Sequence, residues 1–127
     1  MCLQQLENFK VTQSYGWQVF VKSAGDLYPY HFGDKRIPVG KWQTDKFRIF
    51  KRWISNYNIT GLRYKKGYHI FLNEEDVKEY CPSSKNYEIK KVRFKKILAR
   101  GLQEIVTEGP TLQVKVVVCR KRFIEPD

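Results

Sequence analysis

The most regular pattern of hydrophobic and polar residues in the chain predicts a strand that leads directly into a short helix. Residues 68–72 form an apolar and aromatic run that is too hydrophobic to face water on both sides, which is typical of a buried strand. Asn73 follows as a capping residue, and three acidic residues then occupy the first turn of a helix expected over residues 74–80, where the helix dipole favours negative charge. The Cys81-Pro82 pair ends this helix.

A second pattern, the alternation of apolar and polar residues, predicts a hairpin near the N-terminus. Apolar side chains at every second position of residues 16–22 indicate a first strand. Gly25 lies in the turn that follows, where it can adopt a positive φ angle. Residues 27–32 then look extended, but Pro29 has no backbone N–H to donate, so this segment is expected at a sheet edge or in a loop wall.

Two segments in the second half of the chain also predict strands. Residues 87–100 alternate so that apolar side chains share one face of a strand, and three cations share the other: Lys91, Arg93 and Lys95. These cations are about 7 Å apart, near the phosphate spacing of a nucleic-acid strand, although a merely solvated face has the same pattern. Residues 112–119 predict a central strand with a basic cluster just beyond it at residues 120–122, and turns are expected at residues 101–103 and 108–111.

The middle of the chain is ambiguous between helix and strand. In residues 44–54, Phe47, Phe50 and Ile54 have helical spacing, and Thr44 is a good N-cap, so the pattern favours a helix. Basic residues alternate with these rings, which is a pattern that nucleic-acid-binding proteins use, and it is equally the pattern of an ordinary amphipathic helix.

Together these elements predict an α+β fold. We expect residues 1–127 to form a single compact domain, a mostly antiparallel twisted sheet of five to seven strands with one or two short helices. No apolar run approaches the ~18 residues that a membrane helix needs. The three scattered cysteines form no paired spacing, so we expect reduced thiols and a cytoplasmic protein without a membrane anchor.

The charge changes this picture, because the formal net charge is +11. The excess of lysine and arginine over acidic residues is present in both halves of the chain, so it belongs to the folded body rather than to a tail. Such a field attracts polyanions, and the expected partners are nucleic acid or a nucleotide, with an acidic protein as the alternative. Solubility alone requires a net charge of only about 2–8.

Several classes of chemistry are not supported by the sequence. The hydrolase signatures built on serine, histidine and aspartate or on cysteine and histidine are absent, and two histidines with three scattered cysteines give no metal-binding spacing. The segment from Gly33 to Trp42 is no phosphate-binding loop, because six residues separate Gly33 from Gly40 and no serine or threonine follows Lys41. We therefore expect no metal and no cofactor.

Residues 67–80 resemble the strand-and-helix signature of ADP-ribosyltransferases of the poly(ADP-ribose) polymerase type. Gly67 matches the glycine of that signature and Tyr80 its helix tyrosine, whereas His69 occupies the position of the functional tyrosine. His31 begins a segment, His31-Phe32-Gly33, that is similar to the His-Gly pair with which the family contacts NAD, but it is one residue longer. The late glutamate of the family has no match. The resemblance implies a related scaffold and, as one hypothesis, an enzyme that uses NAD.

Two further hypotheses do not require an enzyme. The favoured one is a small, basic, non-enzymatic protein that binds a phosphate-bearing ligand, either RNA, DNA or a nucleotide messenger, and the other is a protein–protein interaction module with a basic face. In size and charge the chain is similar to small phage-encoded anti-defence proteins, which implies a sequestering role in a host cytoplasm. The candidate ligand-binding residues are Lys91, Arg93, Lys95, Arg120, Arg122, Lys41, Trp42, Tyr30, His31, Tyr68 and His69.

Overall fold

The structure, a computed structural model, describes most of the chain: residues 3, 5–30, 35–45, 53–56, 62–65, 67–83, 86–106 and 109–126. In these ranges it contains one short helix and mostly antiparallel strands, seven of which form one sheet while two form a separate hairpin. The predicted α+β class, the mostly antiparallel sheet and its strand number are therefore confirmed. No helix within the described ranges is long and apolar enough to cross a membrane.

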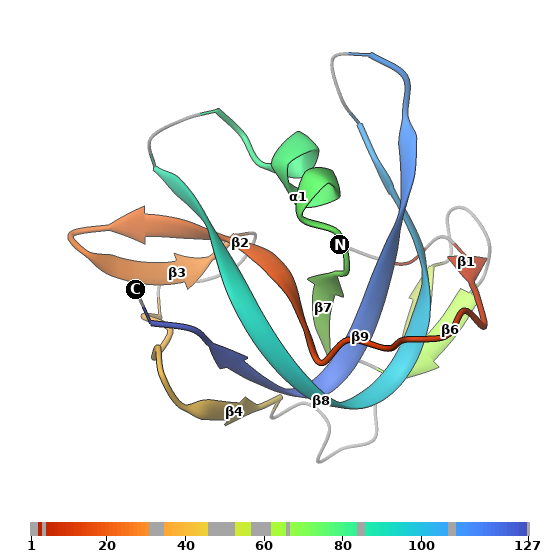
Figure 1. Ribbon diagram of the computed structural model, residues 1–127, viewed down its shortest axis with the longest axis horizontal. Coiled ribbons are helices and arrows are strands. Elements are labelled where there is room, and N and C mark those ends of the chain that lie inside the picture. Colours follow the sequence, from red (N-terminus) through yellow and green to blue (C-terminus); the bar gives the residue numbers. More distant parts are fainter. Residues whose placement is uncertain are drawn as a thin grey trace.

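The elements follow one another along the chain in the order β1 (Gln5–Leu6), β2 (Tyr15–Ser23), β3 (Asp26–Pro29), β4 (Trp42–Thr44), β5 (Trp53–Asn56), β6 (Leu62–Lys65), β7 (Tyr68–Phe71), α1 (Glu74–Tyr80), β8 (Tyr87–Ile105) and β9 (Leu112–Ile124). The last two strands are much longer than the others, with 19 and 13 residues. They form a hairpin that Figure 1 shows extending across the whole molecule. Every other strand of the seven-stranded sheet is arranged around this hairpin.

The large sheet closes on itself. Its strand order is β1-β8-β2-β7-β9-β4, with β3 attached to β2, and β8 also pairs with β9. The four strands β8, β2, β7 and β9 thus form a ring in which each is paired with the next. The contact between β2 and β7 is the shortest link in this ring, because it consists of the single residue pair Trp17 and Phe71.

A bend in β8 and β9 makes this closure possible. Lys96 has a φ angle of 60°, which is rare for a residue other than glycine, and the register with β9 shifts between Ile97 and Ala99. Figure 1 shows the two strands changing direction together near the bottom of the view. Each strand consequently has two arms. β8 lies beside β2 in its first arm and beside β1 in its second, and β9 lies beside β7 in its first arm and beside β4 in its second.

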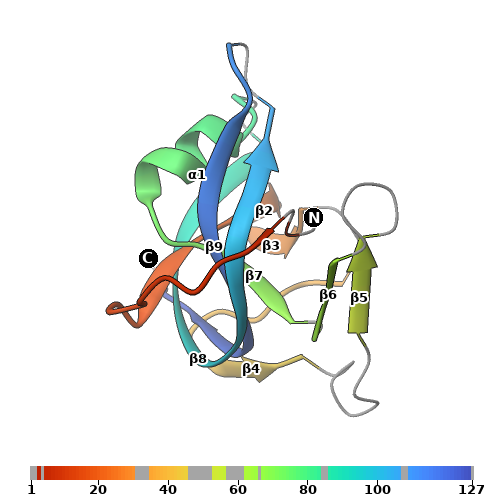
Figure 2. The same cartoon turned by 90° about the vertical axis from the view of Figure 1, so that its right-hand side faces the viewer.

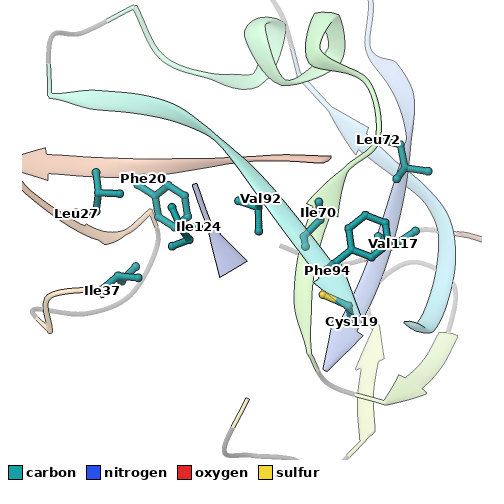
Figure 3. Packing of buried hydrophobic residues seen from close by; sticks show 10 residues of the cluster. All are labelled: Phe20, Leu27, Ile37, Ile70, Leu72, Val92, Phe94, Val117, Cys119 and Ile124. Atoms are coloured by element: carbon teal, nitrogen blue, oxygen red, sulfur yellow. The ribbon is translucent and has the colours of Figure 1, made fainter. Parts of the chain in front are cut away.

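The two faces of the closed sheet bury separate hydrophobic cores. The ring interior contains Phe20, Ile70, Val92 and Val117 among others, and Figure 3 shows these side chains pointing toward one another from different strands. The second core lies on the opposite face, where Val77 of α1 is fully buried. The helix packs on β2, β7 and β8 at this face, and Figure 2 shows it lying along one side of the long hairpin.

The predicted strand and helix at residues 68–80 are confirmed by β7 and α1. The expected capping by Asn73 is only partly correct, because its side chain makes no hydrogen bond to the helix backbone. Its Nδ2 atom instead donates to Oδ2 of Asp76 at 3.1 Å. This bond to a carboxylate orients the amide group of Asn73 through its NH2 end, whereas side-chain capping would require its oxygen to accept from the helix backbone.

The predicted N-terminal hairpin is also confirmed. β2 and β3 pair antiparallel, Gly25 has a φ angle of 83° in the turn, and Pro29 is the last residue of β3 at the sheet edge. His31 and Phe32, which the sequence also predicts to be extended, lie outside the described residues.

Three predictions about element boundaries are wrong. The turn expected at residues 101–103 is part of β8, and the basic cluster at residues 120–122 belongs to β9 rather than following it. Gly101 is needed for close packing and not for a turn, because a Cβ atom there would lie 2.0 Å from the carbonyl oxygen of Gln5 in β1. The helix favoured for residues 44–54 is contradicted at both ends by β4 and β5, and residues 46–52 lie outside the described ranges.

Candidate functional site

A row of four side chains crosses the arm of the sheet that contains β2, β8, β9 and β4. Tyr15 pairs with Arg93, Arg93 with Phe123, and Phe123 with Trp42, so one residue of each strand stands in register with the next. Side chains of directly opposed residues in an antiparallel sheet lie on the same face. Three inter-strand steps place the backbones of Tyr15 and Trp42 roughly 14 Å apart at the two ends of the row.

Lysines flank this row on the same face. Lys91 and Lys95 lie two residues before and after Arg93 in β8, and Lys121 of β9 is directly opposite Lys95. We call the seven residues together the cation–ring face: Tyr15, Trp42, Lys91, Arg93, Lys95, Lys121 and Phe123. The three cations predicted to form a ladder thus stand beside one predicted aromatic residue, Trp42, and two that the sequence did not single out.

The cations of this face lie over its rings. The Nζ atom of Lys91 is 4.2 Å from the ring centroid of Tyr15, and that of Lys95 is 4.0 Å from the ring centroid of Trp42. The guanidinium carbon of Arg93 lies 5.6 Å from the ring centroid of Phe123. These distances are within the range of attractive cation–π contacts. Tyr15 and Trp42 are nevertheless 37% and 39% exposed, which is high for large aromatic side chains in a sheet.

The positive charge of the face is only partly compensated. The Nε atom of Arg93 donates to Oε1 of Glu125, so this cation is held by an ion pair. Among the residues that the structure describes, no carboxylate pairs with Lys91 or Lys95. The direct opposition of Lys95 and Lys121 is unfavourable by itself, because like charges across two strands repel each other. An anion bound between them would relieve that repulsion.

The sequence forces these cations outward through the alternation of β8. Val92 and Phe94 are 0% and 5% exposed in the ring interior, so the residues between and beside them must face the other way. A register slip of one residue would bury the cations and expose the apolar side chains, and both changes are costly. The outward position of the ladder therefore follows from the core.

Arg122, another predicted binding residue, lies inside the ring. It is 9% exposed, and its guanidinium carbon is 4.1 Å from the ring centroid of Tyr68, which also faces the interior core. The guanidinium donates from Nε to Oε1 of Gln43 at 3.2 Å and from Nη1 to Oε1 of Gln18 at 3.1 Å. Burial lowers the pKa of this guanidinium. Arg122 and Tyr68 are therefore part of an internal network and are separated from the cation–ring face.

That network links four strands and a loop. The Nε2 atom of Gln18 donates to the carbonyl oxygen of His69 at 2.8 Å, and that of Gln43 donates to the carbonyl oxygen of Pro38 at 2.6 Å. Through Arg122 these bonds join β2, β7, β9 and β4 to the loop before β4. The arrangement satisfies the polar groups of a buried arginine without leaving it open to a ligand.

His69 is held by its own hydrogen bonds. Its Nε2 atom lies 3.1 Å from the hydroxyl of Tyr64, and that hydroxyl accepts a hydrogen bond from the backbone N–H of Leu3 at 2.9 Å. Burial lowers the pKa of His69 to about 4, so the imidazole is neutral at pH 7. The second histidine, His31, lies outside the described residues, and the predicted pocket with both histidines stays a prediction.

The remaining predicted residues are distributed over other parts of the surface. Tyr30 packs against Tyr80 and Tyr87 at centroid distances of 5.3 and 5.5 Å, beneath α1. Arg120 is partly buried in β9. Lys41 is exposed next to Trp42 and lines an open pocket of about 670 Å³ between the β2–β3 turn and residues 36–41.

The residues that resemble the ADP-ribosyltransferase signature have packing roles. A Cβ atom on Gly67 would lie 2.5 Å from the carbonyl oxygen of Cys119, so glycine is required by the approach of β9. The ring of Tyr80 packs on Phe71 at a centroid distance of 5.1 Å, and burial raises the pKa of its hydroxyl to about 12. Glu104 is an exposed residue of β8.

The described parts of the chain give little support for a nucleophilic cysteine or for a metal site. Burial raises the pKa of the Cys119 thiol to about 12, and burial also raises that of Cys81, so neither is a reactive thiolate. Both are free, as expected for reduced cysteines. Over the same parts, no three histidine, cysteine, aspartate or glutamate side chains gather where they could hold a metal ion.

Tyr15, Lys121 and Phe123 are the members of the face that sequence reasoning missed. Tyr15 precedes the strand expected from residue 16, and Lys121 and Phe123 follow the strand expected to end at residue 119. Extending the apolar and polar alternation by a few residues at these strand ends is the signal that would have included them.

Comparison of the chain with protein-family models, with curated proteins and with solved structures gave no significant match.

Proposed function

We propose that this protein is a non-enzymatic binding protein for a phosphate-bearing polyanion, namely nucleic acid, and that it binds this ligand on the cation–ring face. The observation that carries the proposal is the in-register row of Tyr15, Arg93, Phe123 and Trp42 with lysines on both sides of it. Cations for phosphates and exposed rings for bases are the two components that sequence-tolerant nucleic-acid-binding surfaces combine.

Electrostatics supports the same proposal. The net charge of +11 provides long-range attraction, and Lys91, Lys95 and Lys121 provide local contacts without an ion-pair partner in the described part of the chain. Three phosphate contacts predict a fall in log affinity with log salt concentration with a slope of about −2. We place this activity in the cytoplasm, and in a host cytoplasm if the chain is phage-encoded, where binding sequesters the ligand.

No comparable observation supports the alternative functions, namely an enzyme that uses NAD, a protein that binds a nucleotide messenger and a module that binds an acidic protein. Gly67 and Tyr80 are accounted for by packing, and the imidazole of His69 is bound to Tyr64, so the enzyme hypothesis receives no support from these contacts. A nucleotide messenger requires an enclosed pocket with convergent polar groups, whereas the pocket beside Lys41 is open. An acidic protein partner requires the cations but gives no reason for the exposed Tyr15 and Trp42.

The proposal is tested by titrating the protein with a labelled single-stranded oligonucleotide at several salt concentrations. We expect the double variant Lys91→Ala/Lys95→Ala to weaken binding at least about tenfold in 0.1 M salt and to reduce the magnitude of the slope by about 1.4, since two phosphate contacts are removed.

A matched control is the double variant Lys22→Ala/Lys78→Ala, which removes the same charge from exposed lysines that pair with Glu88 and Glu74 elsewhere on the surface. We expect it to retain nearly all of the affinity. Equal losses in the two double variants would show that net charge alone attracts the ligand, and an affinity that ignores salt would end the proposal.

A further inference from the structure

We propose that the ligand of the cation–ring face is single-stranded nucleic acid that crosses β2, β8, β9 and β4, and that its bases displace Lys91 and Lys95 from the rings of Tyr15 and Trp42. This inference rests on the proposed function. It adds the form of the nucleic acid, its direction across the strands and a change within the site on binding.

The exposed rings select a single strand. Tyr15 and Trp42 stand at opposite ends of the row with more than a third of their surface exposed. A ring on a sheet surface stacks on a base only when that base is unpaired and turned outward, which a duplex does not offer. The ~14 Å between the ends corresponds to about four nucleotides of a stacked strand and to fewer of an extended one.

Phe123 fixes one of these two rings. Its ring centroid lies 5.6 Å from that of Trp42, and the guanidinium carbon of Arg93 lies 5.6 Å from the same Phe123 centroid. Arg93 is held in turn by Glu125. The Trp42 end of the row is therefore supported by packed neighbours, which is the preorganisation that a stacking site requires.

The two lysines occupy the positions that bases would take. Each ammonium lies about one ring-stacking distance above its ring, 4.2 Å for Lys91 and 4.0 Å for Lys95. A base cannot stack on either ring while the ammonium remains there. Both lysines have flexible four-carbon stems and lack a carboxylate partner within the described ranges, so they can rotate away at little expense.

The phosphates of the same strand give the displaced lysines new partners. An ammonium over an exposed ring is weakly held, whereas base stacking on that ring is stronger and a phosphate attracts the freed cation. Lys121 faces Lys95 across the sheet, so a phosphate between them also relieves the repulsion of two like charges. Stacking and phosphate binding are thus coupled. A base stacks on the ring that the lysine has left, and a phosphate binds the lysine that the base has displaced.

The experiment compares four ligands of equal length: a single-stranded DNA, the same backbone without bases, the corresponding DNA duplex and inorganic polyphosphate. We expect the single strand to bind the wild-type protein at least about tenfold more tightly than the abasic strand, with similar salt slopes, because the two differ only in stacking. Equal affinity for all four leaves the polyanion-binding function in place and overturns this inference. Binding to none of them in low salt overturns the function itself.

Variants locate the stacking positions. We expect Trp42→Leu and Tyr15→Leu to reduce the preference for bases about tenfold without changing the salt slope, and Trp42→Phe to retain most of it. Thermal melting of each variant identifies any loss that comes from unfolding. Unchanged base preference in folded Trp42→Leu and Tyr15→Leu overturns the assignment.

Lys95→Met tests the displacement. This change keeps a long flexible side chain and removes the ammonium from the ring of Trp42, so we expect weaker binding to the abasic strand and a salt slope smaller in magnitude by about 0.7. The ratio of single-strand to abasic affinity should rise, because no cation then has to leave the ring. A fall in this ratio overturns the displacement.

Discussion

At the scale of single residues, buried polar side chains decide which conditions the fold tolerates. His69 is the clearest case, because burial lowers its pKa from 6.5 to about 4. In the unfolded chain the imidazole takes up a proton below about pH 6.5, whereas in the folded protein it does so only near pH 4. The unfolded state therefore binds more protons in this window, and the free energy of unfolding falls as the pH drops through it.

We expect this fall to amount to about 2.5 kcal/mol between pH 6.5 and pH 4, measured by urea denaturation at a series of pH values. In a His69→Gln variant most of this pH dependence should be lost. A wild-type protein whose stability is unchanged between these pH values would contradict the neutral, buried state of His69.

Arg122 gives a second prediction at this scale. Arg122→Ala leaves the partly buried oxygens of Gln18 and Gln43 without their donor and empties the space of a buried side chain, and we expect a loss of about 3 kcal/mol in the free energy of unfolding. Arg93→Ala removes a surface ion pair with Glu125 and should cost less than about 1 kcal/mol. Chemical denaturation of both variants makes the comparison, and similar losses would argue against the internal network.

These residues also show how far sequence reasoning reaches. Alternation in β8 was enough to place Lys91, Arg93 and Lys95 on one outward face, since Val92 and Phe94 had to be buried. Arg122 was predicted to bind ligand, because a basic cluster after an apolar strand is usually solvated. Its burial depends on amides from β2 and β4, distant in the sequence, and no local pattern reports such partners.

At the scale of elements, the bend of β8 determines which residues belong to the cation–ring face. Lys96 has a positive φ angle that favours glycine, so we expect Lys96→Gly to change the free energy of unfolding by less than about 0.5 kcal/mol or to increase it. The same substitution at the neighbouring residue, Lys95→Gly, acts on an ordinary strand position and should cost about 1 kcal/mol. Thermal melting of the two variants tests the bend, and a larger loss at residue 96 would contradict it.

Elements with strong local signals were predicted well, and those that depend on distant contacts were not. The strand and helix at residues 68–80 carry an apolar run, acidic residues in the first turn and a terminating proline, all within a few positions. β8 was expected to end near Gly101, because glycine usually marks a turn. It continues because β1 approaches Gly101 closely, and β1 is only two residues long with no pattern of its own.

At the scale of the whole molecule, the two cores share the same long hairpin. Val92 lies in the ring interior and Val116 in the core on the opposite face, and both are fully buried. Because β8 and β9 contribute to both cores, neither core can be lost alone. We expect Val92→Ala and Val116→Ala each to lower the free energy of unfolding by about 2 kcal/mol without changing the denaturant dependence.

The measurement is urea unfolding followed by tryptophan fluorescence and by circular dichroism on the same samples. Coincident single transitions are expected for the wild-type protein and for both variants. Two separated transitions in either variant would show that the cores unfold independently.

The single residue pair between β2 and β7 implies that the ring opens locally at this seam before the whole molecule unfolds, and hydrogen exchange can detect such openings. Only Trp17 and Phe71 pair there, although Gln13 and Gln18 each donate to a carbonyl on the β7 side, at 2.9 and 2.8 Å. The amides along this seam should exchange with solvent deuterium through small openings, whereas that of Val117, in a strand with partners on both sides, should exchange only on global unfolding. Loss of the Gln13 side chain should speed exchange at the seam and leave Val117 unchanged.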